Sequence, residues 1–522
     1  MKSASRTLIQ LTALSLLLPG CLLLTEPRPV EEAKITAPQA YRSASTGNEG
    51  KISTGWVSTF RDRDLNKLVD EALRHNLDIQ EASANLKAAH QTRKSARAAR
   101  LPSINASGNA SRTRRGDGFR EPATDRTPSV AVTPTATTTT VTTPAVSPDT
   151  AMAMQNGGTT GGGTGGSTTT GAMSLTTVDY GLSLDASWEL DLWGRLRDLD
   201  KAATQDYLAA IADFRAARLS LAANTAKSWY DLITARQQQA LAEKTLASFK
   251  SNLRITERNY KAGDDTTSPL DVQFGRNNVA SAERALVSQR LASEEAARTL
   301  EVLLGRYPSA ELKSGDKLPP LSKQVPTGLP SELLWRRPDL VAAAASLKAS
   351  ARRAKAARKE LLPSITLTGG ASTSSEALNR MLTDPEFIVW SAAASLAQTV
   401  YRGGAPSAEA RRALAANEAA LRRFASLALR AFREVESSLA TERSLAEQEK
   451  FLEVELRQAT LAEKQSAREY SDGIVGILEI LEAQRRAVTA RNSMITLRNQ
   501  RLQNRIDLHL ALGGDFSTPP PE

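Results

Sequence analysis

The sequence predicts a mixed membrane protein: a trimeric, twelve-stranded transmembrane β-barrel with four strands per chain, continued by a long α-helical barrel. Three observations predict this fold class. The 522-residue chain contains an internal two-fold repeat, two very long stretches without glycine or proline, and four segments with the alternating pattern of amphipathic strands. The repeat overrides the usual relation between length and domain number, because each copy is half of one architecture.

The repeat is visible in a short motif and in the register around it. Leu-Pro-Ser-Ile begins at Leu101 and again at Leu362, an offset of 261 residues, whereas Leu304-Gly305 recurs as Leu512-Gly513 at an offset of 208. The shorter offset places an insertion in the first copy, the Thr- and Gly-rich tract 112–175, which we expect to be a mobile loop. We therefore predict a first repeat at 61–310, a second at 311–515 and a C-terminal tail at 516–522.

Long helices account for most of each repeat. The stretches 195–262 and 407–472 contain 68 and 66 residues without glycine or proline, so each predicts a helix about 100 Å long. A helix is also predicted over 65–101, where apolar residues recur at helical spacing. Return helices are predicted at 270–304 and 478–512, so that each repeat ends in a very long helical hairpin.

Four segments alternate between apolar and more polar residues: 104–110, 180–190, 365–372 and 388–398. Each is near the length that a tilted strand needs to cross a bilayer, and Trp188 and Trp390 suit its interfaces. Four strands cannot close a barrel, and a lipid-exposed strand edge is not tolerated. Three chains would supply twelve strands and an open lumen. The alternative for the Ala-rich helices is a plain coiled-coil rod, which explains neither the strands nor the N-terminus.

The N-terminus has the features of an export signal. Lys2 and Arg6 precede an apolar run from Leu8 to Leu18, and Leu-Pro-Gly-Cys ends at Cys21. This ending resembles a bacterial lipobox, which implies a signal peptide at 1–20, lipidation (palmitate) of Cys21 and a lipidated leader at 21–60. Leu22 replaces the Asp that retains lipoproteins in the inner membrane, so we expect delivery to the outer membrane. The alternative is an ordinary signal peptide with an incidental cysteine.

Composition argues against several classes of function. Three histidines and one cysteine give no cluster for a zinc site, a disulfide framework or a cysteine nucleophile. We therefore expect no enzyme, no cofactor and no metal site. The net charge is +10, but the basic runs 93–100 and 352–359 lack aromatic platforms for bases. We interpret them as solvated helix faces and expect no nucleic-acid partner.

Three motifs carry a resemblance to a known family. They are Gly-Leu-Pro-Ser-Glu-Leu-Leu-Trp-Arg-Arg-Pro-Asp at 328–339, Trp-Glu-Leu-Asp-Leu-Trp-Gly-Arg at 188–195 and Tyr-Arg-Gly-Gly at 401–404. Over residues 55–515 the chain resembles the TolC-like outer-membrane factors of tripartite efflux pumps, in particular their lipoprotein (NodT-type) branch. The resemblance implies a homotrimeric channel anchored by lipid in the outer membrane and extending into the periplasm. It also implies passive conduction of substrates delivered by a periplasmic adaptor protein and an inner-membrane transporter.

The same resemblance places the gate at the hairpin tips, 260–271 and 470–482. Tip residues are Tyr260, Gly263, Asp271, Tyr470, Gly473, Glu479 and Glu482. Asp271 is similar to a family carboxylate that latches neighbouring helices. Glu479 and Glu482 are similar to paired acids that would form a ring of six carboxylates in a trimer and raise some of their own pKa values by repulsion. Tyr470 matches a tip tyrosine, but Val475 stands where some members carry a latch arginine.

Simpler interpretations exist for these residues. Ser268, Pro269 and Asp271 form the pattern of a helix cap, and the two glutamates could be solvent-facing acids near a helix start. The arginines and acids of the motifs, such as Arg337 and Asp191, are assigned to folding. A lipid-anchored periplasmic coiled-coil adaptor or structural protein is the main functional alternative. A hydrolase would need a catalytic constellation that the scattered histidines do not offer.

Overall fold

The computed structural model describes residues 26–33, 40–43, 55–114, 176–263, 267–315, 317–321, 325, 330, 333–377, 388–472 and 474–514. They divide into two compact units, which are described separately. The helical unit takes in the described residues of Met1–Ser103, Trp188–Leu367 and Ala394–Glu522. The strand unit takes in those of Ile104–Ser187 and Thr368–Ala393.

The elements follow the same order twice. The first series is η2 (Trp56–Phe60), α3 (Arg63–His75), α4 (Leu77–Ala98), β1 (Ser103–Arg114), β2 (Thr176–Leu190), α5 (Arg195–Lys261) and α6 (Pro269–Leu303). The second is α7 (Leu333–Arg336), α8 (Pro338–Lys359), β3 (Ser364–Ser375), β4 (Ile388–Ala397), α10 (Ala405–Ser471) and α11 (Ile477–Ala511), with η1 (Val30–Ala33) in the leader. Both repeats contribute to both units.

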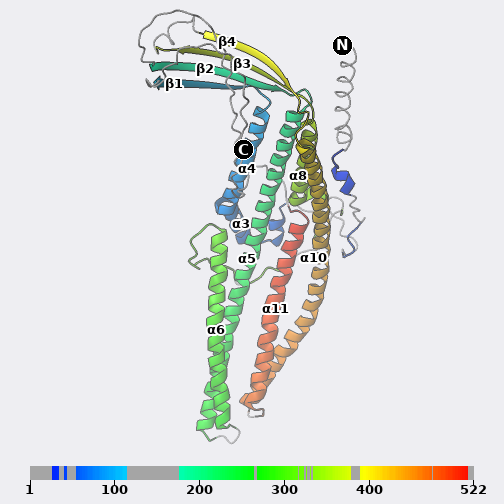
Figure 1. Ribbon diagram of the computed structural model, residues 1–522. Helices are drawn as coiled ribbons and strands as arrows, with labels where there is room; N and C mark the ends of the chain where they lie inside the picture. The colour runs from blue at the N-terminus through cyan, green and yellow to red at the C-terminus, as the bar shows by residue number, and fades with distance from the viewer. Residues whose placement is uncertain are drawn as a thin grey trace, which may run out of the picture. The chain divides into compact units, whose positions relative to one another are not determined.

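The two long hairpins are confirmed. Helices α5 and α10 have 67 residues each, and α6 and α11 return beside them with 35 each (Figure 1). Helix α10 begins two residues before the predicted start because Pro406 lies in its first turn, where the missing backbone N–H is not needed. Among the described residues, no helix has both the length and the apolarity required for a membrane span.

Two similar cores hold the hairpins together within the helical unit. The first joins η2, α3, α4, α5 and α6 around buried side chains such as Leu65, Tyr230 and Leu300. The second joins α7, α8, α10 and the end of α11 around Leu340, Leu421 and others. Helix α8 also packs against α5. Hydrophobic burial therefore fixes the hairpins at one end, far along each long helix from its turn.

The single helix predicted over 65–101 is wrong, because the chain breaks at Asn76. The break has backbone angles φ −64° and ψ 133°, and the Asn76 side chain accepts a hydrogen bond from the Ile79 N–H at 3.2 Å to begin α4. Its Nδ2 also donates to the carbonyl oxygen of Leu303, at 3.1 Å. A bond to a residue so distant in sequence leaves no signal in local periodicity.

The second repeat contains an equivalent break at Arg337. At the offset of 261, Arg337 corresponds to Asn76, and its Nη1 donates to the carbonyl oxygen of Ala511 at 3.3 Å, which corresponds to Leu303 at the offset of 208. In both repeats a glycine with positive φ follows the return helix and touches the residue before the break: Gly305 against His75 and Gly513 against Arg336. The break is therefore a repeated structural feature.

Two residues of the motif at 188–195 stabilise the start of α5. Asp191 accepts hydrogen bonds from the backbone N–H groups of Leu196 and Arg197 at 3.0 and 2.8 Å and so caps α5. Arg195 forms an ion pair with Glu189 at 2.7 Å. These contacts fix the turn between β2 and α5 and confirm the structural interpretation of this motif.

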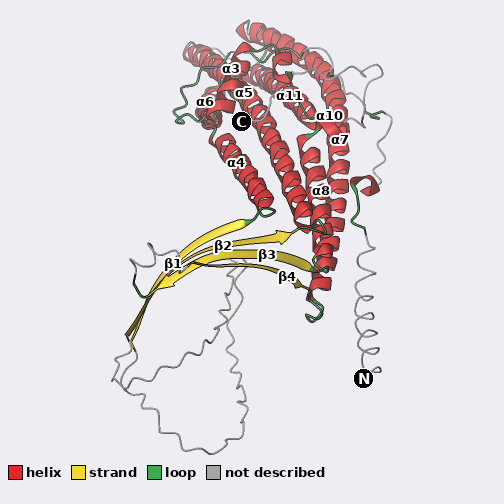
Figure 2. Ribbon diagram, turned by 90° about the horizontal axis from the view of Figure 1, so that it is seen from above, coloured by secondary structure: helices red, strands yellow, loops and turns green. Residues whose placement is uncertain are grey.

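The four strands form one sheet in the order β1-β2-β3-β4 (Figure 2). Ser107 pairs with Ser183 at 2.8 Å, and the strands are several residues longer than predicted at some ends. Strands β1 and β4 lie at the two edges, and within the described residues each has only one neighbour. Large apolar side chains of the sheet are exposed: Ile104, Leu182, Leu184, Ile388, Val389, Trp390 and Leu396.

Several predicted features lie outside the described residues. These are the signal peptide 1–20, Cys21, residues 115–175 of the Thr- and Gly-rich tract, Gly473 and the tail 516–522. The described part of the leader lies along α10. The backbone N–H of Arg28 donates to Asn417 at 2.7 Å, and those of Arg42 and Ser43 donate to Glu436 at 2.8 and 2.9 Å.

A buried histidine makes the stability of the helical unit depend on pH. The His509 ring is 3% exposed, stacks on Trp56 with ring centroids 5.6 Å apart, and lacks a hydrogen-bond partner at either nitrogen within the described residues. Burial, helped by the charge of Arg505, lowers the pKa of His509 to about 4 from the usual 6.5. Between these values the unfolded chain binds the extra proton.

We therefore expect stability to be unaffected by His509 above pH 6.5 and to fall by about 3 kcal/mol as the pH decreases to about 4. Thermal unfolding of the purified protein, followed by far-UV circular dichroism across this range, measures the effect. His509→Phe, which keeps a ring against Trp56, should flatten the pH dependence. An equally steep dependence in that variant would show that other groups cause it.

Candidate functional site

The first hairpin tip is built around a glycine turn and a helix cap. Helix α5 ends with Tyr260 half exposed, and Gly263 adopts φ 74°, a left-handed conformation that favours glycine. Helix α6 begins with a capping box in which Ser268 Oγ accepts from the Asp271 N–H at 3.3 Å and the Asp271 carboxylate accepts from the Ser268 N–H at 2.8 Å. Asp271 therefore forms the helix cap that its spacing to Ser268 predicts.

The second tip follows α10 and uses backbone hydrogen bonds to one carbonyl. The carbonyl oxygen of Glu469 accepts from the backbone N–H of Ile474 at 2.8 Å and, more weakly, from that of Val475 at 3.4 Å. Helix α11 then begins at Ile477 with Gly476 as its N-cap and no side-chain cap. Ile474 and Leu478 are 71% and 58% exposed. Both tips therefore present apolar side chains to their surroundings, since Leu270 of the first tip is also 59% exposed.

A row of hydrogen bonds joins the two hairpins near their tips. The Tyr470 hydroxyl lies 2.7 Å from Thr256 Oγ1, and Thr256 is fully buried. One turn earlier on α5, Asn252 Nδ2 donates to Gln484 Oε1 at 2.9 Å. Another turn back, Ser248 Oγ accepts from Gln484 Nε2 at 3.1 Å. We call these five residues the tip seam.

The tip seam brings together residues that sequence reasoning treated separately or missed. Tyr470 was singled out, but its partner was not, and Ser248, Asn252, Thr256 and Gln484 were overlooked. The available signal was the spacing of four between Ser248, Asn252 and Thr256, which puts three polar side chains on one face of α5. A polar row on a buried face indicates a specific pairing, because buried polar groups require partners.

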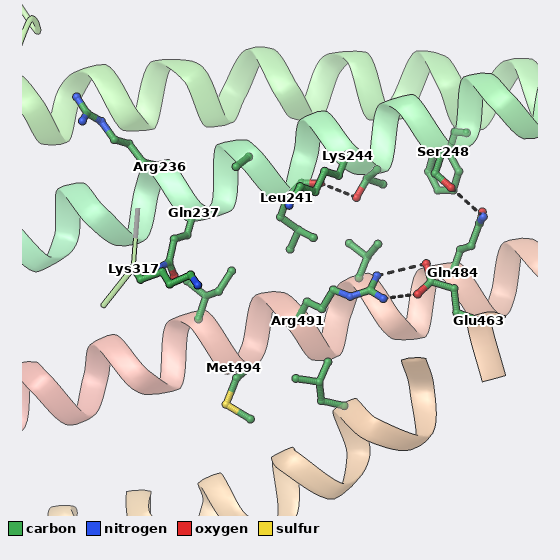
Figure 3. A pocket seen from close by; sticks show the side chains of 16 residues that line it. Arg236, Gln237, Leu241, Lys244, Ser248, Lys317, Glu463, Gln484, Arg491 and Met494 are labelled. Carbon is green, nitrogen blue, oxygen red and sulfur yellow. Dashed lines mark hydrogen bonds and ion pairs between the residues drawn. The ribbon is translucent and has the colours of Figure 1, made fainter. Parts of the chain in front are cut away.

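Beside the seam lies a groove of about 830 Å³ between α5, α10 and α11. Figure 3 shows its labelled side chains, with Gln484 pointing toward Ser248 and Arg491 toward Glu463. Arg491 and Glu463 form an ion pair that links α11 to α10. Lys244 and Lys317 also line the groove. Polar contacts and apolar side chains such as Leu241 and Met494 both lie between the hairpins here.

The two predicted gate acids differ in their surroundings. Glu479 is exposed in the first turn of α11, and no ion pair to it exists within the described residues. Glu482 pairs with Arg485 at 2.8 Å and with Arg486 at 2.7 Å. Hydrogen bonds from Arg485 and then Arg486 lower the pKa of Glu482 to about 2. The upward shift was expected from repulsion within a ring of six carboxylates in a trimer, and for that assembly it stays a prediction; within one protomer, the two arginines on the same helix lower the pKa of Glu482.

The described residues contain no group of three or more His, Cys, Asp and Glu side chains placed to hold a metal ion. The arrangement instead offers a mechanical property. Each hairpin is fixed by an apolar core at one end, and the polar contacts of the tip seam join the two hairpins near their tips. Together with a sheet whose edge strands each have one neighbour among the described residues and whose apolar side chains are exposed, this defines a class: a channel-forming subunit.

Comparison with known proteins identifies the family within this class. The model of the outer membrane efflux protein family matches residues 68–139, 157–306 and 329–514, so the chain belongs to that family. It is an outer-membrane channel of an efflux system, and its family members are channel proteins. The predicted resemblance is confirmed at this level.

Individual relatives align along nearly the whole chain. The cation efflux system protein CusC of Escherichia coli is 25% identical over 511 residues, covering 96% of this chain and 97% of that protein. A probable outer membrane lipoprotein, SilC of Salmonella typhimurium, is 25% identical over 508 residues, with 96% and 97% covered. The solved CmeC outer membrane channel of Campylobacter jejuni has a TM-score of 0.77 at 20% identity, covering 93% of this chain and 94% of that chain, which shows a shared fold.

Proposed function

We propose that three copies of this chain form a passive duct across the outer membrane, with a twelve-stranded barrel and a periplasmic tunnel of six long hairpins. The observation that carries the proposal is the four-stranded sheet. Its edge strands β1 and β4 each have one neighbour among the described residues, and no part of the chain that the structure describes covers apolar side chains such as Trp390, which is 79% exposed. Strand edges from identical copies would pair, and lipid would cover the apolar face.

The tunnel would receive substrates from an inner-membrane transporter through a periplasmic adaptor protein. The exposed apolar residues Leu270, Ile474 and Leu478 at the tips support contact with such an adaptor. Acylation of Cys21 would anchor the leader in the inner leaflet, consistent with the leader's path along α10. We assign no enzymatic step to the chain, because energy would come from the transporter.

The experiment that tests this function is conductance of the purified full-length protein in a planar lipid bilayer. We expect discrete single-channel openings and a trimer in cross-linking. The alternative, a periplasmic adaptor or structural protein with coiled-coil hairpins, should give no channels. A stable monomer that never conducts would overturn the proposal.

We propose that the closed tips form the gate and that Glu479 lines it. In a trimer, three Glu479 carboxylates without ion-pair partners would meet at the constriction, whereas each Glu482 is already balanced by Arg485 and Arg486. A narrow ring of carboxylates concentrates cations. The acidic character of the aperture would therefore rest on Glu479 more than on Glu482.

Glu479→Ala should accordingly lower the cation-to-anion permeability ratio by roughly a factor of two to five and weaken block by multivalent cations. Glu482→Ala should also lower the ratio, because it leaves two arginines unpaired. Reversal potentials in asymmetric salt measure both effects. Glu447→Ala, an exposed acid on α10 far from the tip, is the matched control. Unchanged selectivity in Glu479→Ala would remove this residue from the gate.

A further inference from the structure

A basic pocket lies in the helical unit, next to the points where β2 ends and β3 begins. It has a volume of about 480 Å³ and is lined mainly by α5 and α8. Its positive side chains are Arg197, Lys201, Arg352, Lys355, Arg358 and Lys359, and its negative ones are Glu26 and Asp198. Six positive and two negative charges give this junction pocket a net charge of +4.

The two acids do not satisfy the six cations. Asp198 is 5% exposed and accepts from Arg352 at 3.2 Å and from Lys359 at 2.5 Å. Glu26 lies 3.9 Å from Lys355. No ion pair to the remaining three cations, Arg197, Lys201 and Arg358, exists within the described residues.

Arg358 is the most informative of the three. It is 7% exposed, and its buried Nε has no hydrogen-bond partner in the described part of the chain. A buried N–H group that lacks an acceptor is costly, because its lost hydration is not replaced. The expectation of a solvated helix face over 352–359 is therefore wrong for Arg358, and the pocket around it has the character of an anion site.

The repeat shows which cations of α8 are shared by its two copies. At the offset of 261, Lys355 and Arg358 correspond to Lys94 and Arg97, whereas Arg352 and Lys359 correspond to Gln91 and Ala98. Arg352 and Lys359 pair with the buried Asp198. The pocket therefore combines Arg358, a cation present in both repeats, with two cations that only the second repeat has.

The surroundings of the pocket match a membrane interface. Leu192 and Trp193 line it and are 61% and 47% exposed, and the Trp193 indole N–H donates to the Pro363 carbonyl at 2.7 Å. Exposed tryptophans at strand ends mark the interface level of barrels. If the sheet crosses the outer membrane as proposed above, on which this inference rests, the pocket opens at the headgroups of the inner leaflet.

We propose that the junction pocket binds the phosphate headgroup of an anionic phospholipid of the inner leaflet. Arg358 and Lys359 would hold the phosphodiester from within the pocket. Arg197 and Lys201 would attract it from the rim, and Leu192 and Trp193 would contact the glycerol and upper acyl region. A zwitterionic headgroup would bind less well, since its cationic group would enter a pocket that already has excess positive charge.

The first test uses the full-length protein in neutral detergent, titrated separately with dihexanoylphosphatidylglycerol, dihexanoylphosphatidylcholine and inorganic phosphate. Native mass spectrometry counts bound molecules, and the thermal transition reports stabilisation. We expect phosphatidylglycerol to bind and raise the transition temperature, with little effect of the other two. Equal stabilisation by inorganic phosphate would identify a small-anion site and overturn the lipid assignment, as would equal binding of both lipids.

The second test uses paired variants. Arg197→Gln with Lys201→Gln removes two exposed cations of the pocket rim and should weaken phosphatidylglycerol binding by roughly 30-fold. The control, Lys94→Gln with Arg97→Gln, makes the same change on exposed residues of α4 outside the pocket and should bind as wild type. If Arg197→Gln with Lys201→Gln binds phosphatidylglycerol as tightly as wild type does, the proposal is wrong, whether or not the variant still forms a trimer.

Conductance measured on the same preparations separates the two proposals. A conducting channel without preference for phosphatidylglycerol would overturn the lipid site alone. A protein that binds the lipid but never conducts would overturn the channel and, with it, the placement of the pocket at the membrane interface.

Discussion

Arg337→Ala should destabilise the helical unit by about 3–5 kcal/mol, the largest effect on stability that we expect from a single side chain. Arg337 is 9% exposed. It donates to both carboxylate oxygens of Asp339 at 3.0 and 2.7 Å, to Glu434 at 2.6 Å and to the carbonyl oxygen of Ala511 at 3.3 Å. These bonds connect α8, α10 and the end of α11 at the helix break of the second repeat.

Truncation at this position leaves two carboxylates without their shared cation and removes the contact that holds α11 against the break. Arg337→Lys should restore only part of the loss, because an ammonium cannot reproduce the two parallel bonds to Asp339. Thermal unfolding followed by circular dichroism, and the yield of assembled protein in the membrane, measure the effect.

The control is Arg336→Ala, which removes the same charge from the neighbouring residue. Within the described residues Arg336 has no ion pair, so its loss should change stability by less than about 1 kcal/mol. If both variants behave alike, net charge rather than the buried network determines stability at this site, and the structural role given to Arg337 is wrong.

The second large effect is expected at the tip seam. Gln484→Ala combined with Tyr470→Phe removes the bonds from α10 and α11 to Asn252, Ser248 and Thr256, although the Thr256 hydroxyl keeps its bond to the Asn252 carbonyl oxygen at 3.0 Å. Each unsatisfied buried group costs about 1–3 kcal/mol. Because these contacts join the two hairpins near their tips, we expect the closed arrangement to lose stability relative to an open one by enough to raise the open population roughly 10- to 100-fold.

Single-channel recording should therefore show longer or larger openings of the double variant than of wild type, and cells producing it should admit large antibiotics more readily. Gln465→Ala is the control, since Gln465 is exposed on α10 and, within the described residues, bonds to Glu469 of its own helix. A double variant that folds, assembles and conducts as wild type would show that the seam does not keep the tips closed.

Local sequence signals determined most of the secondary structure. The absence of glycine and proline over 195–262 and 407–472 is sufficient to predict α5 and α10, because a long uninterrupted run of good helix formers has few alternatives. Alternation similarly located all four strands of the sheet. The internal repeat predicted that the second half would reproduce the first. Each of these signals depends on neighbours within a few residues or on comparison of the chain with itself.

The site was less predictable. The capping box of Asp271 follows from its spacing to Ser268, and the pairing of Glu482 with Arg485 and Arg486 could have been inferred from spacings of three and four on one helix. Repulsion between the acids concerns the assembled trimer and stays a prediction. The partner of Tyr470 could not be inferred in this way, because Thr256 lies 214 residues away in the sequence.

The sequence by itself thus determined the repeat, the hairpins, the strands and the family. Only the tertiary structure decided where the helix breaks at Asn76, which polar residues join the hairpins and why Arg358 is buried among other cations. The physical reason is the sequence separation over which each interaction acts. Helix and strand formation depend on backbone bonds and side-chain spacing within a few residues, whereas these three features depend on contacts between segments that packing alone brings together.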